Sequence, residues 1–261
     1  MAERTVEIFD LQGKATGKVT LPTVFSTPLR PDVIKRAVLA IQSNRLQPQG
    51  RDPMAGKRTT AESRGTGMGI ARVPRIKGGS GRAAFAPSTV GGRQPHPPTA
   101  EKKIVKNIPK KEAKLALTSA IAATSQKEIV AKRGHMIEKV VQIPLIIDDA
   151  IENLIRAKDV EAVFTSLGVD GDVTRVRDSR NIRAGKGKLR GRKMKQAVGP
   201  LIVVCDGVNL VAAASNIPGV QVTTVQNLNT EMLAPGTHPG RLTVWTNGAI
   251  EQLNTLYGEN V

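Results

Sequence analysis

The sequence predicts an α/β protein with an open, mainly parallel sheet, helices on both faces and a long extended basic loop. Three observations support this fold class. Short strand patterns alternate with short helical patterns along most of the chain. The run Leu201–Cys205 is apolar throughout, which is typical of a strand buried on both faces. Two segments rich in Arg and Lys show neither pattern. We therefore expect one α/β globular domain over residues 1–261, which is long enough to bury a core.

The N-terminal part is predicted to contain two strands and a helix, followed after the basic loop by a second helix. Val6–Phe9 and Lys18–Leu21 have the pattern of short strands around a glycine-containing turn. Pro31 suits the first turn of a helix whose apolar residues then share one face. Pro109 begins the second helix, which has a face of small residues.

The second half of the chain continues the alternation. Val140–Ile147 is predicted to be a strand, with Pro144 at a sheet edge or at the strand end. Asp148 and Asp159 are the predicted N-caps of two short helices. After Leu201–Cys205, the remaining predicted elements are the strands Val220–Val225 and Leu242–Trp245 and a helix that begins at Asn247. Phe164 and Trp245 are expected in the core.

The net charge is +17, from 39 Lys and Arg against 22 Asp and Glu, and all of it lies in two segments. Residues 45–100 contain ten basic and two acidic residues (+8), and residues 175–196 contain ten basic and one acidic residue (+9). Like charges at this density repel one another, so a phosphate backbone is the expected partner. The predicted RNA-contacting residues are Arg45, Arg51, Lys57, Arg58, Arg64, Arg72, Arg75, Lys77, Arg82, Arg93, Arg175, Arg177, Arg180, Arg183, Lys186, Lys188, Arg190, Arg192, Lys193 and Lys195.

Neither basic segment has the pattern of an independent fold. In residues 45–100, 17 of 56 residues are Gly or Pro, which exceeds the roughly 25–30% typical of low-complexity chain. We predict an extended arm, residues 45–108, that orders when it packs into folded RNA. In the second basic segment, residues 172–196, three glycines interrupt any continuous helix. A short helix with an irregular loop, also lying on RNA, is predicted there.

The residues of an enzyme or metal site are not found in the sequence. The three histidines lie far apart, and the single cysteine, Cys205, falls within an apolar run, so no metal site is expected. Gly65–Gly69 lacks the preceding strand of a dinucleotide loop, and Gly185–Gly191 lacks the ending of a P-loop. Asp206 suits a turn better than an acid catalyst. We expect no cofactor.

Two function classes remain as alternatives to a non-enzymatic RNA-binding protein. An RNA-modifying enzyme would bind a nucleotide cofactor on the sheet, which a cofactor titration would detect. A basic protein on a membrane surface would need an amphipathic helix with bulky aromatic residues. Only 2% of the residues are aromatic, which disfavours this second alternative and also disfavours a module that stacks unpaired bases.

Several long motifs carry a specific resemblance. They are RGTGMGIARVPRIKGG (64–79), AFAPSTVGGRQPHPP (84–98), SNIPGVQV (215–222), LNTEMLAPGTHPGRL (228–242) and VWTNGAIEQL (244–253). In this order they closely resemble the large-subunit ribosomal protein L-four family in its archaeal and eukaryotic form. The chain differs from the eukaryotic form at Arg64 and Met68 and has no long C-terminal extension, which favours the archaeal type.

This resemblance implies a non-enzymatic, structural constituent of the large ribosomal subunit in the cytoplasm. The implied partners are large-subunit ribosomal RNA, other large-subunit proteins and the nascent peptide, with no membrane. The arm would thread through RNA, support assembly and help to line the nascent-peptide exit tunnel. From this resemblance and the local chemistry, the tunnel-facing residues are expected to be Gly67, Met68, Gly69 and Ile70.

Overall fold

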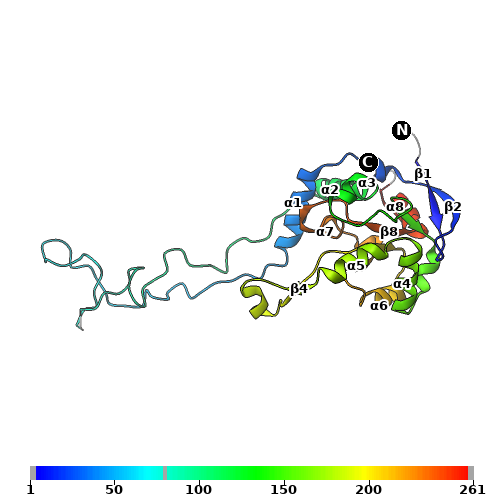
Figure 1. Cartoon of the computed structure of the whole chain (residues 1–261). Helices are drawn as coiled ribbons and strands as arrows, with labels where there is room; N and C mark the ends of the chain where they lie inside the picture. Colours follow the sequence, from blue (N-terminus) through cyan, green and yellow to red (C-terminus); the bar gives the residue numbers. More distant parts are fainter. Residues whose placement is uncertain (1–3, 79–80, 258–261) are drawn as a thin grey trace. The chain divides into compact units, whose positions relative to one another are not determined.

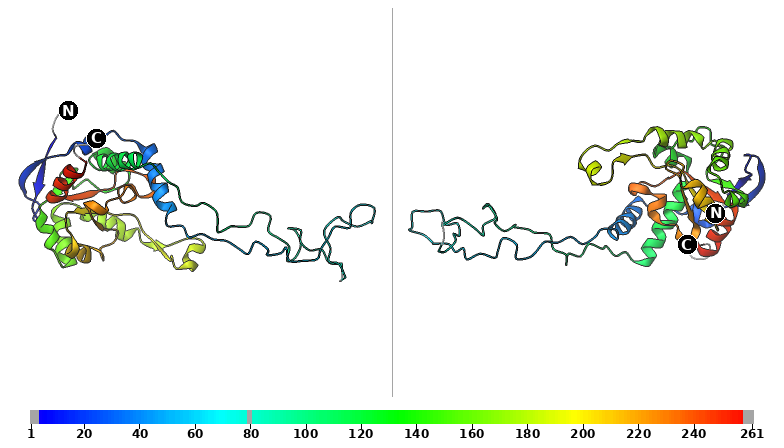
Figure 2. Two further views of the ribbon diagram at one scale, coloured as in Figure 1. Left: turned by 180° about the vertical axis from the view of Figure 1, so that it is seen from behind. Right: turned by 90° about the horizontal axis from the view of Figure 1, so that it is seen from below.

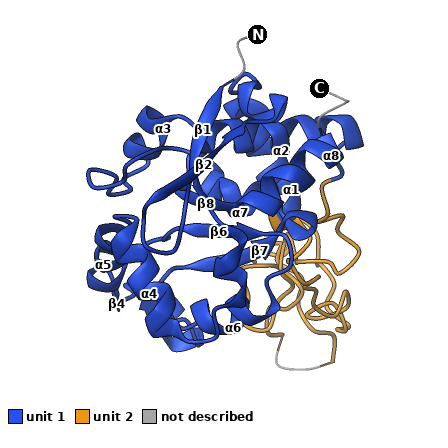
Figure 3. Ribbon diagram, turned by 90° about the vertical axis from the view of Figure 1, so that its right-hand side faces the viewer, with its two compact units in different colours: residues 1–41, 107–261 blue, residues 42–106 orange. Residues whose placement is uncertain are grey.

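A computed structural model of the chain describes residues 4–78 and 81–257. The chain divides into two compact units (Figure 3). Unit 1 comprises residues 1–41 and 107–261, and unit 2 comprises residues 42–106. Within the described residues, no helix combines the length and apolar character needed to cross a bilayer.

Unit 1 is built on a six-stranded sheet with the order β2-β1-β3-β8-β6-β7. β1 and β2 form an antiparallel hairpin, and every other neighbouring pair is parallel. The predicted open, mainly parallel sheet is therefore confirmed. The strands are β1 (Thr5–Phe9), β2 (Ala15–Thr20), β3 (Leu145–Ile147), β6 (Leu201–Val204), β7 (Gln221–Thr224) and β8 (Thr243–Thr246).

Helices cover both faces of this sheet, as the sequence predicts (Figures 1 and 2). The longer helices are α1 (Pro31–Ser43), α2 (Lys110–Thr124), α4 (Ala157–Ser166), α5 (Asp170–Asp178) and α8 (Asn247–Tyr257). Shorter helices are α3 (Lys127–Lys132), α6 (Val208–Ala214) and α7 (Thr230–Leu233). The 3₁₀ turns are η1 (Thr23–Ser26), η2 (Asp149–Asn153), η3 (Lys186–Arg190), η4 (Val225–Asn227) and η5 (Pro235–Thr237).

Successive side chains of the buried strands point to opposite faces of the sheet, so a hydrophobic core forms on each face. In β6, Ile202 and Val204 face the core formed with α4, α5 and α6, whereas Leu201 and Val203 face the core formed with α1, α2, α7 and α8. Phe164 lies in the first core. Trp245 lies in the second, packed edge-on against Phe25 with ring centroids 5.6 Å apart. Both residues belong to the core, as predicted.

Three predicted elements start more than one residue away from the predicted position. The strand predicted as Lys18–Leu21 is β2, which starts three residues earlier, at Ala15. The strand predicted for residues 140–147 pairs only over Leu145–Ile147, because the chain before Pro144 runs as turn and irregular structure. Pro144 was predicted at a sheet edge or at a strand end. Because β3 is an interior strand of the sheet, the strand end is the position observed.

The helix predicted to be capped by Asp159 starts at Ala157, so Asp159 lies in its first turn. A negative charge at that position also interacts favourably with the helix dipole. The Asp148 N-cap is confirmed, because its side chain accepts the Asp149 N–H, although it caps a 3₁₀ turn.

Candidate nucleic-acid interface

Residues 44–106 contain no helix and no strand longer than an isolated bridge in the described part of unit 2. Two limbs of chain nevertheless lie side by side, as both views in Figure 2 show. The Arg51 N–H donates to the Pro98 carbonyl at 3.2 Å. A Cβ at Gly56 would lie 2.7 Å from the backbone of Gly92 and Arg93. Glycine thus permits a close approach of the two limbs that a side chain would block.

Arg75 is the junction of two successive loops in unit 2. Its backbone forms bridges with both Glu62 and Ala83, and its N–H donates to the Glu62 carbonyl at 3.0 Å. Its half-buried guanidinium donates to the Gly81 carbonyl at 2.9 Å. Arg75 therefore holds the fold of unit 2 through both its backbone and its side chain.

The loop between Glu62 and Arg75 contains the predicted tunnel-facing residues. Gly65, Gly67 and Gly69 have φ angles of +74°, +87° and +65°, a conformation that favours glycine. No heavy atom lies within 4 Å of where a Cβ would be placed on any of the three. Met68 is 59% exposed and Ile70 is 41% exposed. The loop is therefore open, with two apolar side chains exposed on it.

The predicted RNA-contacting residues of the arm fall into two groups. Arg58 pairs with Asp52, Lys77 pairs with Glu62, Arg51 donates to Gln94, and Arg93 lies over the ring of Phe85. By contrast, four exposed cations form no ion pair with the described chain: Lys57, Arg64, Arg72 and Arg82. Arg45 is also exposed. Within residues 45–100, the two acids thus pair with two of the ten cations.

The second basic segment begins with α5 and continues as a two-stranded ribbon. The predicted short helix is present as η3, whereas two pairs of residues join the ends of the predicted irregular loop. β4 (Asn181–Ile182) pairs antiparallel with β5 (Met194–Lys195), and the Arg183 side chain donates to the Arg192 carbonyl at 3.0 Å. These contacts join residues nine to fourteen positions apart, so local periodicity could not predict them. We call residues 181–195 the basic ribbon.

A buried carboxylate holds α5 in place at the start of this segment. Asp172 is fully buried, and its oxygens lie 2.9 Å from His135 Nδ1, 3.1 Å from the Met136 N–H nitrogen and 2.9 Å from Arg175 Nε. Arg175 also donates to the Val198 carbonyl at 2.9 Å, beyond the far end of the basic ribbon. Arg175 thereby connects α5 to the chain that returns from the ribbon.

The surroundings of Asp172 favour its charged form. Desolvation raises the pKa of this carboxyl, but hydrogen bonds and charges from His135 and Arg175 outweigh the effect and leave the pKa below its usual value. Sequence reasoning missed this acid, although its position three residues before Arg175 on one helix was the available signal.

Seven cations of the second basic segment remain exposed and without an ion pair in the described chain. Arg177 lies 3.5 Å from Glu161, and Arg175 and Arg183 are used internally. The seven are Arg180, Lys186, Lys188, Arg190, Arg192, Lys193 and Lys195. A dense, uncompensated positive surface of this kind fits a polyanion.

Arg241 is a buried cation that the sequence analysis did not identify. It is 1% exposed, and its guanidinium donates to Gln221 Oε1 and to four carbonyls, including Gly199 at 2.8 Å and Met232 at 3.0 Å. Burial, together with the charge of Arg133, lowers its pKa to about 10. Arg241 thus fixes the chain where it leaves the second basic segment and enters β6.

The carboxyl end of the sheet, where α/β enzymes place catalytic groups, is occupied by structural hydrogen bonds. Glu152 accepts the N–H of Cys205 at 2.8 Å, the N–H of Asp206 at 3.1 Å and the hydroxyl of Thr246 at 3.0 Å. Burial and neighbouring carboxylates raise the pKa of the Cys205 thiol, which disfavours a nucleophilic thiolate. The described residues include no group of three or more His, Cys, Asp or Glu arranged to hold a metal.

Comparison with known proteins identifies the family. Residues 19–256 match the Ribosomal protein L4/L1 family. The chain is 49% identical to large ribosomal subunit protein uL4 of Methanosphaera stadtmanae, over 98% of each chain. It is 49% identical to the protein of the same name from Methanococcoides burtonii, over 97% of this chain and 99% of the relative. For that of Saccharolobus islandicus, the identity is 48% over 97% of this chain and 95% of the relative. The chain therefore belongs to the Ribosomal protein L4/L1 family.

Proposed function

We propose that this chain is a structural component of the large ribosomal subunit that binds its ribosomal RNA through the arm and the basic ribbon. The observation that carries the proposal is the concentration of the excess charge in two segments that contribute little to the core. Of the twenty cations in residues 45–100 and 175–196, eleven are exposed and form no ion pair with the described chain, four in the first stretch and seven in the second. The full-length relatives named as large-subunit proteins support the same conclusion.

The chemistry of these segments suits the backbone of folded RNA. Guanidinium and ammonium groups bind phosphate and the 2′-hydroxyl, and glycine lets the protein backbone approach the RNA closely. The six aromatic residues of the chain offer little surface for base stacking. Binding is therefore driven mainly by charge and shape.

The tip of the arm is proposed to line the nascent-peptide exit tunnel. Met68 and Ile70 are exposed apolar side chains on an open loop, with Arg72 exposed nearby. Each limb of the arm has roughly 20–25 residues, and an extended chain spans at most 3.3–3.6 Å per residue, so the limbs are long enough to cross several tens of ångströms of RNA. The apolar side chains then face the lumen, while Arg72 and Arg64 bind phosphate.

One measurement tests the ribosomal role, and a second tests the tunnel assignment. The tagged chain should co-sediment with the large subunit after a high-salt wash, and its loss from that fraction would refute the ribosomal role. A photoreactive residue in place of Ile70 should crosslink to nascent peptide in translating ribosomes. Crosslinks to RNA alone would refute the tunnel assignment while leaving RNA binding intact.

A further inference from the structure

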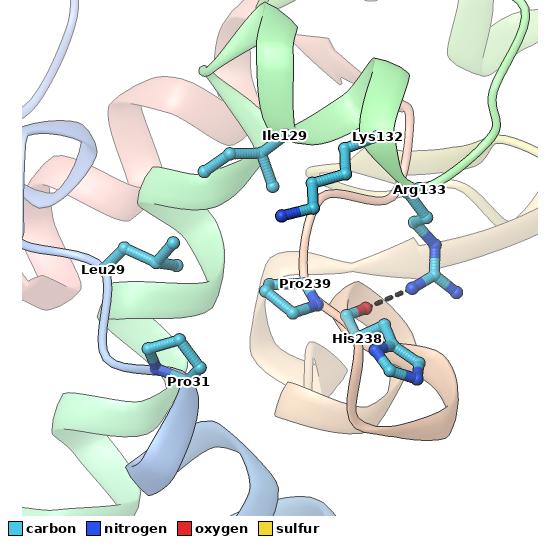
Figure 4. A pocket seen from close by; sticks show the side chains of 7 residues that line it. All are labelled: Leu29, Pro31, Ile129, Lys132, Arg133, His238 and Pro239. Atoms are coloured by element: carbon cyan, nitrogen blue, oxygen red, sulfur yellow. Dashed lines mark hydrogen bonds between the residues drawn. The ribbon is translucent and has the colours of Figure 1, made fainter.

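A cavity of about 570 Å³ opens on unit 1, and Figure 4 shows the residues that line it. Its volume falls within the roughly 300–1,000 Å³ of ligand pockets. The wall brings together the first residue of α1 and the segment before it, helix α3 with the residue that follows it, and the loop after α7. Four lining residues are apolar: Leu29, Pro31, Ile129 and Pro239. The other three are basic: Lys132, Arg133 and His238.

The loop that forms one wall is fixed in an unusual conformation. Thr237 has a φ of +74°, which is rare for a β-branched residue. Gly240 has a φ of +90°, and a Cβ there would lie 2.6 Å from the Ile129 side chain. Arg133 hydrogen-bonds to the carbonyls of both Pro235 and His238, which holds the loop against α3. The cavity is therefore preformed, at the cost of local backbone strain.

The polar part of the cavity presents donors and positive charge. No carboxylate lines it, and neither Lys132 nor Arg133 forms an ion pair with the described chain. The Lys132 ammonium points into the space between Leu29, Ile129 and Pro239 (Figure 4). Two of the five N–H donors of Arg133 are used on carbonyls, so three remain. Burial and the nearby positive charge of Arg175 both lower the pKa of Arg133. The charge of Arg175 thus adds to the positive potential at the cavity.

We propose that this cavity binds a segment of a neighbouring large-subunit protein in which an Asp or Glu stands beside Leu, Ile, Val or Pro. The apolar floor takes the hydrophobic side chain, and the carboxylate pairs with Lys132 and the free donors of Arg133. A peptide fits better than RNA because four of the seven lining residues are apolar, and an RNA phosphate backbone offers no hydrophobic group to cover them. The inference rests on the proposed function, since the partner belongs to the large subunit.

The test uses large subunits assembled with the full-length chain carrying a diazirine amino acid in place of Leu29. We expect a crosslink to a protein, and mass spectrometry should locate it at a segment with an acidic residue beside an apolar one. Crosslinks only to RNA, or only within the chain itself, would overturn the inference. A chain that fails to co-sediment with the large subunit would instead refute the proposed function.

Charge variants then test the recognition chemistry. In the Leu29-substituted chain, Lys132→Glu should reduce the crosslink yield about tenfold, as expected when a charge pair across an interface is reversed. Lys132→Arg should retain the yield. Lys127→Glu on the same helix, outside the cavity, provides the matched control for the change in net charge. Equal yields from Lys132→Glu and Lys127→Glu would show that the basic groups do not recognise the partner.

Discussion

The two basic segments carry nearly the same net charge, +8 over residues 45–100 and +9 over residues 175–196, but they hold it differently. In the arm, two acids pair with Arg58 and Lys77 inside the segment itself. The second segment has a buried acid, Asp172, close to its start, which anchors α5 and Arg175. The comparison shows that nearly equal net charge can accompany either a self-contained loop or a more compact ribbon held by the hydrophobic core.

The largest expected effect is the salt dependence that both segments share. If about half of the twenty cations contact phosphate, affinity for a large-subunit RNA fragment should fall by about 10³–10⁵ between 50 and 200 mM salt, measured by filter binding. Neutralising Lys57 and Arg64 to Gln should flatten this dependence more than neutralising the paired Arg58 and Lys77. A salt-independent affinity would contradict the electrostatic mechanism for both segments.

The Asp172 anchor distinguishes the second segment most sharply. Asp172→Ala leaves His135 and Arg175 without their buried partner and should lower the free energy of unfolding by about 3–5 kcal/mol in denaturant titrations. The pKa of this carboxyl is lower in the folded state than in the unfolded state. The contribution of Asp172 to the free energy of unfolding is therefore fully present above the pKa of the unfolded state. It is lost as the pH falls through the pKa of the folded state. If Asp172→Ala left the free energy of unfolding at neutral pH unchanged, Asp172 would not be an anchor of the second segment.

Within the second segment, Arg175 and Lys188 should affect different measurements. Arg175→Ala removes hydrogen bonds to Asp172 and Val198 and should cost about 1.5–3 kcal/mol of stability. Lys188 is exposed and unpaired, so Lys188→Ala should leave the thermal midpoint unchanged and reduce the slope of log affinity against log salt by about 0.7–0.9. Equal loss of stability in both variants would contradict the division between anchoring and binding cations.

The smallest expected effect is that of the arm on the folding of unit 1. Replacing residues 50–95 with a short Gly/Ser linker should change the free energy of unfolding of unit 1 by less than about 1 kcal/mol, because lengthening or shortening a loop costs little. The chain should still join the large subunit through the second basic segment. Loss of the cooperative calorimetric transition would show that the arm contributes to the core.

The part of the fold that could be predicted from the sequence depends on local patterns. The apolar run Leu201–Cys205, the prolines before α1 and α2 and the cap at Asp148 each act over a few residues. The boundaries of β3 and α4 were wrong because proline and acidic residues are compatible with more than one position near the end of an element.

The candidate interface was less predictable than the fold. Charge density located both basic segments, but the roles of individual cations depend on contacts between distant residues. Arg175 meets His135 only through Asp172, and Arg241 bonds to carbonyls 9 to 42 positions away in the chain. No residue pattern within a short window contains these pairings, so a list of basic residues could not separate anchors from exposed cations.

The central place of β8 has a consequence for synthesis of the protein. In the described sheet, β8 lies between β3 and β6, and its last residue is Thr246 in a chain of 261. A nascent chain exposes both basic segments before the two halves of its sheet can join. Any product truncated before β8 therefore retains both basic segments while exposing unpaired strand edges, which are prone to aggregation. The sheet of unit 1 can therefore close only after β8 has been synthesised, when the chain is nearly complete.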